Sequence, residues 1–311
     1  GRHGPGVGPS YYQFRSCRRL PCLSQRLVLL MTPSSAAALD LQDITCIFTS
    51  RDAPGQRYTA VQGASLAVAP GEFVSVVGPT GCGKSTLLNV GAGLLAPSSG
   101  QVRVFGQPLA GLNRRAGYMF QTESLMPWKT ALDNVIAGLV FRGTGVVEAD
   151  RLGRAWLARV GLAGFEDRYP HQLSGGMRKR VAMAQTLILD PDIILMDEPF
   201  SALDVQTRQL MENELLDLWA APSASGSAQG RAVLFITHDL DEAIALSDRV
   251  VVLSAGPATR PIGEFAIDLP RPRNVAEIRN EPRFVELHSQ IWAVLRDEVL
   301  KGYDQQKRKA A

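Results

Sequence analysis

The chain has 311 residues, 45% of them hydrophobic, which suits one large domain or two modest ones with a substantial core. No run of about 18 apolar residues occurs, so no apolar helix of membrane-spanning length is encoded. The net charge of +3 is uneven: residues 1–30 carry five arginines and no acid, which leaves −2 for the remainder (3 − 5 = −2) and excludes a basic nucleic-acid-binding body.

Residues 1–38 differ in character from the rest of the chain. The first residue is Gly, and the Arg-rich, acid-free start is typical of a targeting segment or of translated sequence upstream of a true start. We favour the second interpretation, with Met31 as the start, and expect a disordered leader over 1–38. The cysteine spacing predicts neither a zinc site nor a disulfide framework, which is typical of the cytoplasm.

The hydrophobic pattern alternates between strand and helix periods along the chain. It predicts strands at residues 39–49, 58–68, 72–77, 101–105, 192–196, 232–236 and 250–253. It predicts a helical region over about 125–172, including 150–161, and further helices at 176–189 and 275–300. Loops are expected at 51–57 and 220–230, and a frayed polar tail from 301. Such alternation indicates a largely parallel sheet covered by helices.

A phosphate-binding loop, G-x-x-x-x-G-K-[ST], occupies residues 78–85. Its glycines let successive backbone N–H groups point at phosphate oxygens. Lys84 can reach the β- and γ-phosphates, and the Ser85 hydroxyl can bind Mg²⁺. The loop follows an apolar strand and precedes a helix, whose N-terminus favours an anion, and this context argues against an ordinary turn. The expected nucleotide-binding residues are Gly78, Pro79, Thr80, Gly81, Cys82, Gly83, Lys84, Ser85 and Thr86.

Two carboxylates follow the buried strand at 192–196. Asp197 and Glu198 therefore lie at the C-terminal end of a strand, where α/β sheets bind ligands. Asp197 can hold the Mg²⁺ shell, and Glu198 can polarise an attacking water. Alone, such a pair could also begin a helix; the phosphate loop and the motifs around the pair favour chemistry.

Four further motifs lie in order around these two. They are Gln121, Leu173-Ser174-Gly175-Gly176-Met177, Ser201-Ala202-Leu203-Asp204 and His238. Singly, each has a structural explanation: a surface Gln, a turn, or a hydrogen-bonding His after a strand. Together and in this order they resemble the ABC-type ATPases, the nucleotide-binding subunits of ABC transporters, over about residues 39–255.

The resemblance implies a fold and a division of the chain. The expected fold is that of an α/β P-loop NTPase, with a RecA-like core, an antiparallel β subdomain and an inserted α-helical subdomain. The ATPase domain would span residues 39–270, with the helical subdomain at about 122–180. A C-terminal helix and a polar tail would occupy 271–311.

The same resemblance implies roles for the motifs. The phosphate loop becomes the Walker A motif, and Asp197 with Glu198 closes Walker B. Ser174, Gly175 and Gly176 form the signature that caps ATP from a partner subunit, while Asp204 crosses the dimer interface. The implied catalytic residues are Glu198, His238, Gln121 and Lys84, and the implied Mg²⁺ ligands are Ser85, Gln121 and Asp197.

Two positions need separate mention. The family stacks adenine on an aromatic residue at the end of the first strand, and both Phe48 and Tyr58 suit that place. Lys179 stands where the family usually has Gln, two residues after Met177, which weakens one expected polar contact.

Several details resemble the ATPases of nitrate, sulfonate and taurine importers. They are the runs 121–128, 134–135, 197–204, 269–273, 283–287 and 291–296. The resemblance implies an ATP- and Mg²⁺-dependent homodimer on the cytoplasmic face of the cell membrane. Its partners would be integral membrane permease subunits, contacted around Met126 to Asn134, and through them a periplasmic or extracellular substrate-binding protein. The alternative is a soluble ABC ATPase without a membrane role, against which the single compact cassette argues.

Overall fold

The computed structural model describes residue 1 and residues 36–49, 56–122, 124–201, 203–221 and 230–310, without the side chains of 306 and 308–310. The described helices and strands all belong to the unit of residues 35–311. Most of the expected leader, of the hairpin loop at 51–57 and of the loop at 220–230 lies outside the described residues.

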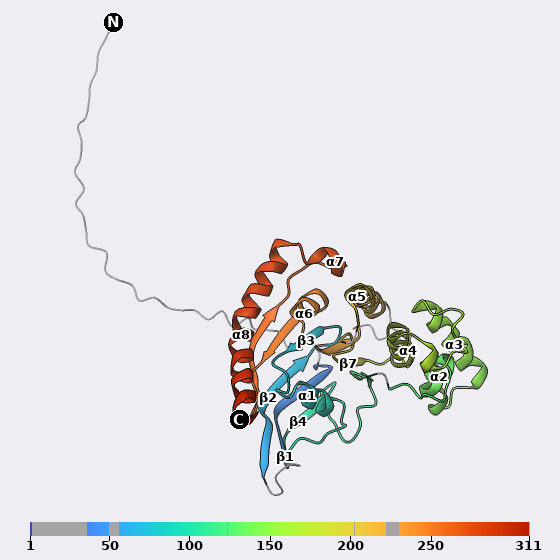
Figure 1. The fold of residues 1–311 in the computed structure, drawn as a ribbon, viewed down its shortest axis with the longest axis horizontal. Helices are drawn as coiled ribbons and strands as arrows, with labels where there is room; N and C mark the ends of the chain where they lie inside the picture. Colours follow the sequence, from blue (N-terminus) through green and yellow to red (C-terminus); the bar gives the residue numbers. More distant parts are fainter. Residues whose placement is uncertain (2–35, 50–55, 123, 202, 222–229, 311) are drawn as a thin grey trace. The chain divides into compact units, whose positions relative to one another are not determined.

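A six-stranded sheet forms the centre of the described unit, in the order β10-β9-β3-β8-β7-β6 (Figure 1). Neighbouring strands from β9 to β6 run parallel, and β10 is antiparallel to β9. The strands are β3 (Phe73–Val77), β6 (Ala116–Met119), β7 (Ile193–Asp197), β8 (Ala232–Ile236), β9 (Arg249–Leu253) and β10 (Pro261–Ala266). The predicted strands of this sheet are confirmed, while short β6 and β10 were not predicted because neither shows an extended apolar run.

A second, antiparallel sheet has the order β2-β1-β4-β5. Its strands are β1 (Leu39–Thr49), β2 (Arg57–Val68), β4 (Ser99–Val104) and β5 (Gln107–Pro108). Strands β1, β2 and β4 were predicted, and each predicted end lies within two residues of the observed end. Leu39, Leu41 and Ile44 of β1 are fully buried, so this sheet turns one apolar face inward.

The described helices are α1 (Lys84–Gly91), α2 (Ala131–Phe141), α3 (Val146–Arg159), η1 (Pro170–Gln172), α4 (Gly175–Leu187), α5 (Val205–Ala220), α6 (Leu240–Leu246), α7 (Val275–Ile278) and α8 (Pro282–Ala310). The helix predicted at 176–189 and the helical region predicted over 125–172 are confirmed, the helix predicted over 275–300 is interrupted at residues 279–281, and helices at 205–220 and 240–246 were not predicted. Among the described residues, no helix is both long and apolar enough to cross a membrane.

The expectation of a frayed tail from Lys301 is wrong, because α8 continues to Ala310. Phe284, Leu287, Ile291 and Leu295 are buried at helical spacing and anchor α8 on the core. Lys301 adds an ion pair of 2.6 Å to Glu298 one turn earlier. Figure 1 shows α8 on the side of the sheet away from α2 and α3.

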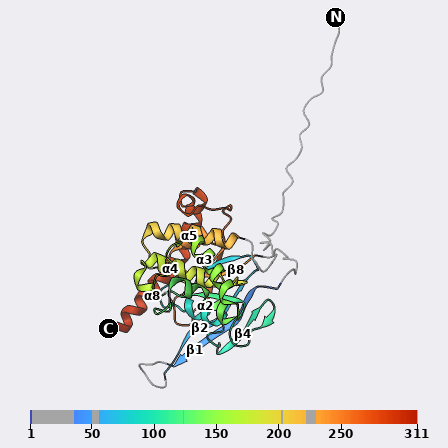
Figure 2. The same cartoon turned by 90° about the vertical axis from the view of Figure 1, so that its right-hand side faces the viewer.

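The central sheet separates two hydrophobic cores. Along β3, Phe73 and Val77 belong to one core and Val74 and Val76 to the other, as the two-residue period of a strand requires. Helices α2 to α8 cover the first core, and α1 with the antiparallel sheet covers the second. Figures 1 and 2 show α4 and α5 on the side opposite β1 and β4.

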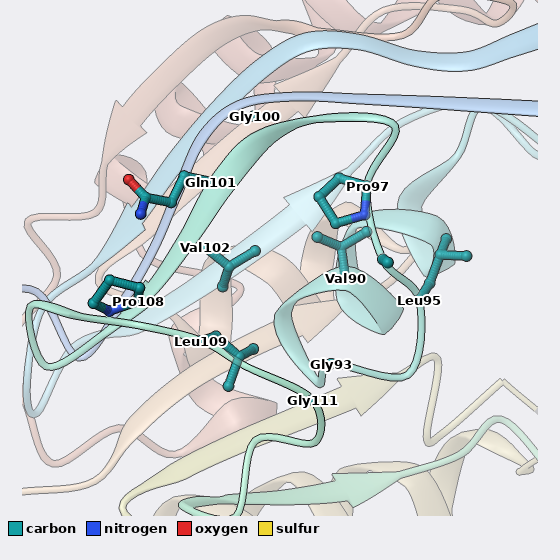
Figure 3. A pocket seen from close by; sticks show the side chains of 11 residues that line it. Val90, Gly93, Leu95, Pro97, Gly100, Gln101, Val102, Pro108, Leu109 and Gly111 are labelled. Carbon is teal, nitrogen blue, oxygen red and sulfur yellow. The ribbon is translucent and has the colours of Figure 1, made fainter.

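A hollow of about 340 Å³ lies between the end of α1 and strands β4 and β5 (Figure 3). Backbone and apolar side chains line it, with Gln101 as the one polar side chain among its described lining residues. None of the residues that the sequence motifs single out belongs to this described lining.

Candidate active site

The phosphate loop joins β3 to α1 through backbone that two of its glycines make possible. Gly83 has φ +107° and a Cβ there would lie 3.1 Å from Val61, so a side chain would be both strained and crowded. At Gly78 a Cβ would lie 3.0 Å from the sulfur of Cys82 and 3.1 Å from Leu253 Cβ. The loop therefore packs tightly against the second core at its base.

Lys84 folds back over the loop. Its Nζ donates to the carbonyls of Gly78, at 2.9 Å, and Pro79, at 3.1 Å, and the residue is 5% exposed. Helix α1 begins here without a side-chain cap and without an acid in its first turn. A buried ammonium beside uncapped helical N–H groups fits a phosphate chain, which supplies the acceptors that a cap would otherwise provide.

Exposure divides the rest of the loop. Thr80, Gly81 and Ser85 are exposed, whereas Pro79 is buried and Thr86 is half-buried on α1. Cys82 is buried against the core, and burial raises the pKa of its thiol, which Lys84 partly opposes. Thr80, Gly81 and Ser85 are thus the loop residues that are open to an approaching ligand.

Ser85 and Asp197 form the pair that suits a divalent cation. The Ser85 hydroxyl donates to Asp197 Oδ1 at 3.0 Å across the ends of β7 and α1. Burial raises the pKa of the Asp197 carboxyl, and the Ser85 hydrogen bond opposes this rise. Among the described residues no cluster of three or more His, Cys, Asp or Glu could hold a metal. Mg²⁺ needs no such cluster, because it binds one or two carboxylates together with substrate phosphates, so this pair fits it.

Glu198 is where three strand ends converge. Gln121 Nε2 donates to Glu198 Oε2 at 3.0 Å, and His238 Nδ1 lies 3.3 Å from the same oxygen. The three residues follow β6, β7 and β8, which are neighbours in the sheet. Glu198 has φ +43°, a left-handed conformation that is costly for Glu and points to a functional constraint. One carboxylate oxygen thus has two polar neighbours that can align it toward a water.

Lys179 contacts this group from α4. Its Nζ donates to the backbone carbonyl of Gln121, and the residue is 2% exposed. From the sequence, Lys179 was expected to weaken a polar contact of the family. In the structure the lysine side chain makes a polar contact of its own, with the backbone of Gln121, whose side chain in turn contacts Glu198.

The signature residues and Asp204 lie in a separate hollow of about 380 Å³. Ser174 caps α4 by accepting from Met177 N at 3.3 Å, and Asp204 caps α5 by accepting from Thr207 N at 3.0 Å. The hydrogen bond from the Thr207 backbone lowers the pKa of Asp204. A Cβ on Gly176 would lie 2.8 Å from Thr207, so the two helix starts touch. Gly175 also lines this hollow, and none of its described lining residues belongs to the phosphate loop.

Helix α8 forms part of the phosphate-loop surroundings, which was not predicted from the sequence. Trp292, Leu295, Val299 and Tyr303 line a hollow of about 320 Å³ together with the first three residues of the loop and His238. The signal was present in the spacing of these four apolar residues along one helical face. The expectation of a frayed tail obscured it.

Phe48 and Tyr58, the two candidates for the adenine platform, lie side by side. They pair directly across β1 and β2, with ring centroids 5.6 Å apart and planes 28° apart. Tyr58 is 50% exposed and Phe48 is half-buried. The structure therefore brings both candidates into one stacked pair.

Comparisons with known proteins identify the family of the chain. The family model described as "ABC transporter" matches residues 61–201. An uncharacterized ABC transporter ATP-binding protein of Methanocaldococcus jannaschii is 46% identical over 265 residues, covering 85% of this chain and 93% of the relative. The taurine import ATP-binding protein TauB of Burkholderia pseudomallei is 40% identical over 256 residues, covering 81% and 94%. Its counterpart in Chromobacterium violaceum is 42% identical over 245 residues, covering 77% and 90%.

Solved structures extend the likeness to the fold. An ATP-binding cassette in a dimeric post-hydrolysis state with ADP and Pi superposes with a TM-score of 0.64 at 31% identity, covering 75% of this chain and all of that one. The expected P-loop NTPase fold of an ABC ATPase is thereby confirmed. The chain belongs to the ABC transporter ATP-binding proteins: it binds ATP, and its ATP hydrolysis is coupled to transport.

Proposed function

We propose that this chain energises an importer of a small anion, such as nitrate, an alkanesulfonate or taurine. In this proposal, residues 39–270 form the ATPase domain with a helical insertion at about 122–180, and residues 271–311 add a C-terminal helix. Two copies work on permease subunits at the cytoplasmic face of the cell membrane. A substrate-binding protein outside the membrane delivers the anion to the permease.

The convergence of Gln121 and His238 on one oxygen of Glu198 carries the proposal of hydrolysis. Glu198 aligns a water for attack on the terminal phosphate and draws off its proton as the bond forms. His238 and Gln121 hold the carboxylate in the orientation that this task needs. Lys84 supplies the positive charge beside the phosphates at the other side of the site.

Ser85 and Asp197 are proposed to hold Mg²⁺, and Gln121 would be the third ligand. When bound, the ion neutralises charge on the phosphate oxygens. Asp197 orients the Ser85 hydroxyl through their 3.0 Å hydrogen bond. The stacked pair of Phe48 and Tyr58 is the proposed platform for the adenine ring.

The homodimer is supported by the separation of two hollows. The hollow beside the phosphate loop includes no described signature residue, and the signature hollow includes no described phosphate-loop residue. Ser174 and the start of α4 suit an anion, as the start of α1 does. A second copy would place the signature of one chain over the phosphate loop of the other, and the solved relatives are dimers.

An apolar groove beside α2 is the proposed seat for a helix of the permease. Two hollows of about 620 and 340 Å³ share Tyr118 and Phe120, so they form one groove. Met126 and Phe141 line it, and Phe141 is 80% exposed. The occupant is taken to be a permease helix because several relatives are named for import.

The groove can be tested by substitution. Met126→Asp should abolish co-purification of the permease, because it places a charge in the apolar groove. Trp128→Ala should weaken it, since Trp128 is 73% exposed on the same segment. Val147→Ala is the matched control, being 86% exposed on α3 but absent from the described lining of the groove. An assembly that all three variants leave intact would contradict the proposed seat.

The proposal as a whole is tested by purification from native membranes. The tagged chain is solubilised in mild detergent, and the proteins that accompany it are identified. We expect a polytopic membrane protein in equal amount, and ATPase activity that rises with nitrate, alkanesulfonates or taurine plus the binding protein. A chain that remains in the soluble fraction with only cytosolic partners would favour the alternative, a soluble ABC ATPase.

A further inference from the structure

Arg208 lies on the first turn of α5 and joins two loops that carry different motifs. Its Nη1 donates to Asp239 Oδ2 at 3.0 Å and lies 3.4 Å from Glu242 Oε1. Its Nη2 donates to the carbonyl of Leu203 at 3.3 Å. Leu203 directly precedes Asp204, and Asp239 directly follows His238. One guanidinium thus connects the Asp204 loop to the His238 loop.

The Asp239 end of this bridge controls the start of α6. Asp239 caps the helix by accepting from the N–H groups of Asp241, at 2.8 Å, and Glu242, at 3.3 Å. A carboxylate that caps a helix and also binds an arginine is held in one position. Because His238 is the preceding residue, the position of its backbone depends on the same carboxylate.

The other neighbour of His238 is tied to the same group. Thr237 Oγ1 donates to Glu242 Oε2 at 2.6 Å and accepts from Asp239 N at 3.0 Å. Glu242 is 3% exposed, and burial raises its pKa, with Arg208 among the charges that oppose the rise. Both chain neighbours of His238, Thr237 and Asp239, therefore belong to one hydrogen-bond network. Arg208 connects this network to the Asp204 loop.

The shape of arginine suits this bridge. Its planar fork presents N–H donors in two directions, so it can bind a carboxylate and a backbone carbonyl at once. The side chain is 21% exposed, which limits competition from water. A lysine at this position has a single ammonium on a flexible chain and would not fix both loops in one geometry.

We propose that Arg208 is a positioning residue for ATP hydrolysis, which couples the Asp204 loop to His238 and, through His238, to Glu198. Displacement of the Asp204 loop by a second copy would shift Arg208 and with it the Asp239 carboxylate. His238, 3.3 Å from Glu198 Oε2, would follow. The inference rests on the proposed dimeric ATPase and assigns the internal link by which one copy senses the other.

The kinetic test uses Arg208→Gln in two backgrounds. In the wild-type chain we expect kcat to fall about tenfold with the KM for ATP within about twofold, because the nucleotide contacts remain. In the His238→Ala background, the same substitution should change kcat by less than about twofold, since residues acting in one unit are not additive. Arg208→Lys should give an intermediate kcat. Equal fold-losses in both backgrounds, or a loss expressed in KM, would overturn the proposal.

Hydrogen exchange measures the coupling without any turnover. Arg208→Gln should speed amide exchange both in residues 203–207 and in residues 237–242. The matched control is Arg231→Gln. Arg231 is a buried arginine whose Nη2 lies 2.7 Å from Asp190 Oδ1 and whose Nη1 donates to the Leu218 carbonyl near the C-terminal end of α5. This variant should lower stability without faster exchange in 237–242. Faster exchange confined to 203–207 in Arg208→Gln would refute the link, whereas an inactive wild-type chain would count against the ATPase proposal alone.

Discussion

The two functional regions of this chain are built differently. The strand-end region gathers Gln121, Glu198 and His238 from three neighbouring parallel strands, and their side chains meet at one carboxylate oxygen. The signature region joins the N-termini of α4 and α5, where Ser174 and Asp204 act as helix caps. In the first, two polar side chains contact one carboxylate, whereas the second consists of two adjacent helix starts, which favour an anion.

The two kinds of local structure suit different tasks. Parallel strand ends fix side chains against a buried sheet, which suits groups that must be held within fractions of an ångström. Helix starts on a surface suit contacts that form only when another molecule arrives. We therefore expect the strand-end region to hold the reacting groups and the signature region to contact a second copy. Arg208 is the link that we propose between these two regions.

The largest effect should come from Glu198→Gln in the strand-end region. The amide keeps the contact to Gln121 but cannot accept a proton, so turnover should fall by at least about 100-fold. ATP binding should persist and trap a closed dimer, which size-exclusion chromatography with ATP would detect. Glu277→Gln on α7 provides the control for loss of an acid. Turnover close to wild type in Glu198→Gln would remove the assigned role.

A second prediction concerns α5, whose N-terminus belongs to the signature region. Glu212 on α5 is fully buried, and burial with the nearby Glu242 raises its pKa to about 8. Because the folded pKa exceeds the unfolded one, the folded state binds the extra proton and stability falls as pH rises from about 4.5 to 8.

Glu212→Gln removes this titration. Its free energy of unfolding relative to wild type should therefore increase between pH 5 and pH 8, by on the order of 2 kcal/mol. Denaturant unfolding at both pH values measures the difference, with exposed Glu281→Gln as the control. A difference that stays constant or shrinks with pH would contradict the raised pKa.

The third prediction compares two glycines of the phosphate loop. Gly83 combines φ +107° with a crowded Cβ position, while Gly81 has φ +74° and open space. Gly83→Ala should raise the KM for ATP about tenfold, because the loop must shift, and Gly81→Ala should raise it severalfold less. Steady-state kinetics of the two variants measures this difference in KM. An equal rise of the KM for ATP in both would show that crowding at Gly83 does not matter.

The smallest effect is expected at the aromatic pair. Tyr58→Ala should weaken nucleotide binding about three- to tenfold, and Phe48→Ala by a similar amount, because each ring supports the other. Titration with ATP and with an abasic triphosphate separates stacking from phosphate contacts. If both variants bind ATP as tightly as wild type, the adenine lies elsewhere.

Much of the fold could be predicted from the sequence because local patterns decide it. The alternation in β1 and β2 and the apolar runs of β7, β8 and β9 follow from the period of a strand buried on one or both faces. The phosphate loop was recognisable because its residues are contiguous. Short β6 escaped the pattern, since four residues give too few periods to distinguish strand from loop.

The contacts within the site could not be predicted in this way. Gln121 and Glu198 are 77 positions apart, and their contact depends on β6 lying next to β7 in the sheet, which no local pattern encodes. Arg208 belonged to no predicted motif or element, because the carboxylates that it contacts, Asp239 and Glu242, lie at the start of α6, 31 or more positions later in the chain. Phe48 and Tyr58 remained alternatives until the strand register paired them.

The most direct test of the central claim mixes two inactive variants. Lys84→Ala disables the phosphate loop, and Ser174→Arg disables the signature, so each homodimer has two broken sites. If each site combines the phosphate loop of one copy with the signature of the other, a mixed dimer regains one intact site. An equal mixture should then recover up to about one quarter of wild-type ATPase activity. Two affinity tags verify that mixed dimers form. If these dimers show no activity above the sum of the single variants, the account is contradicted.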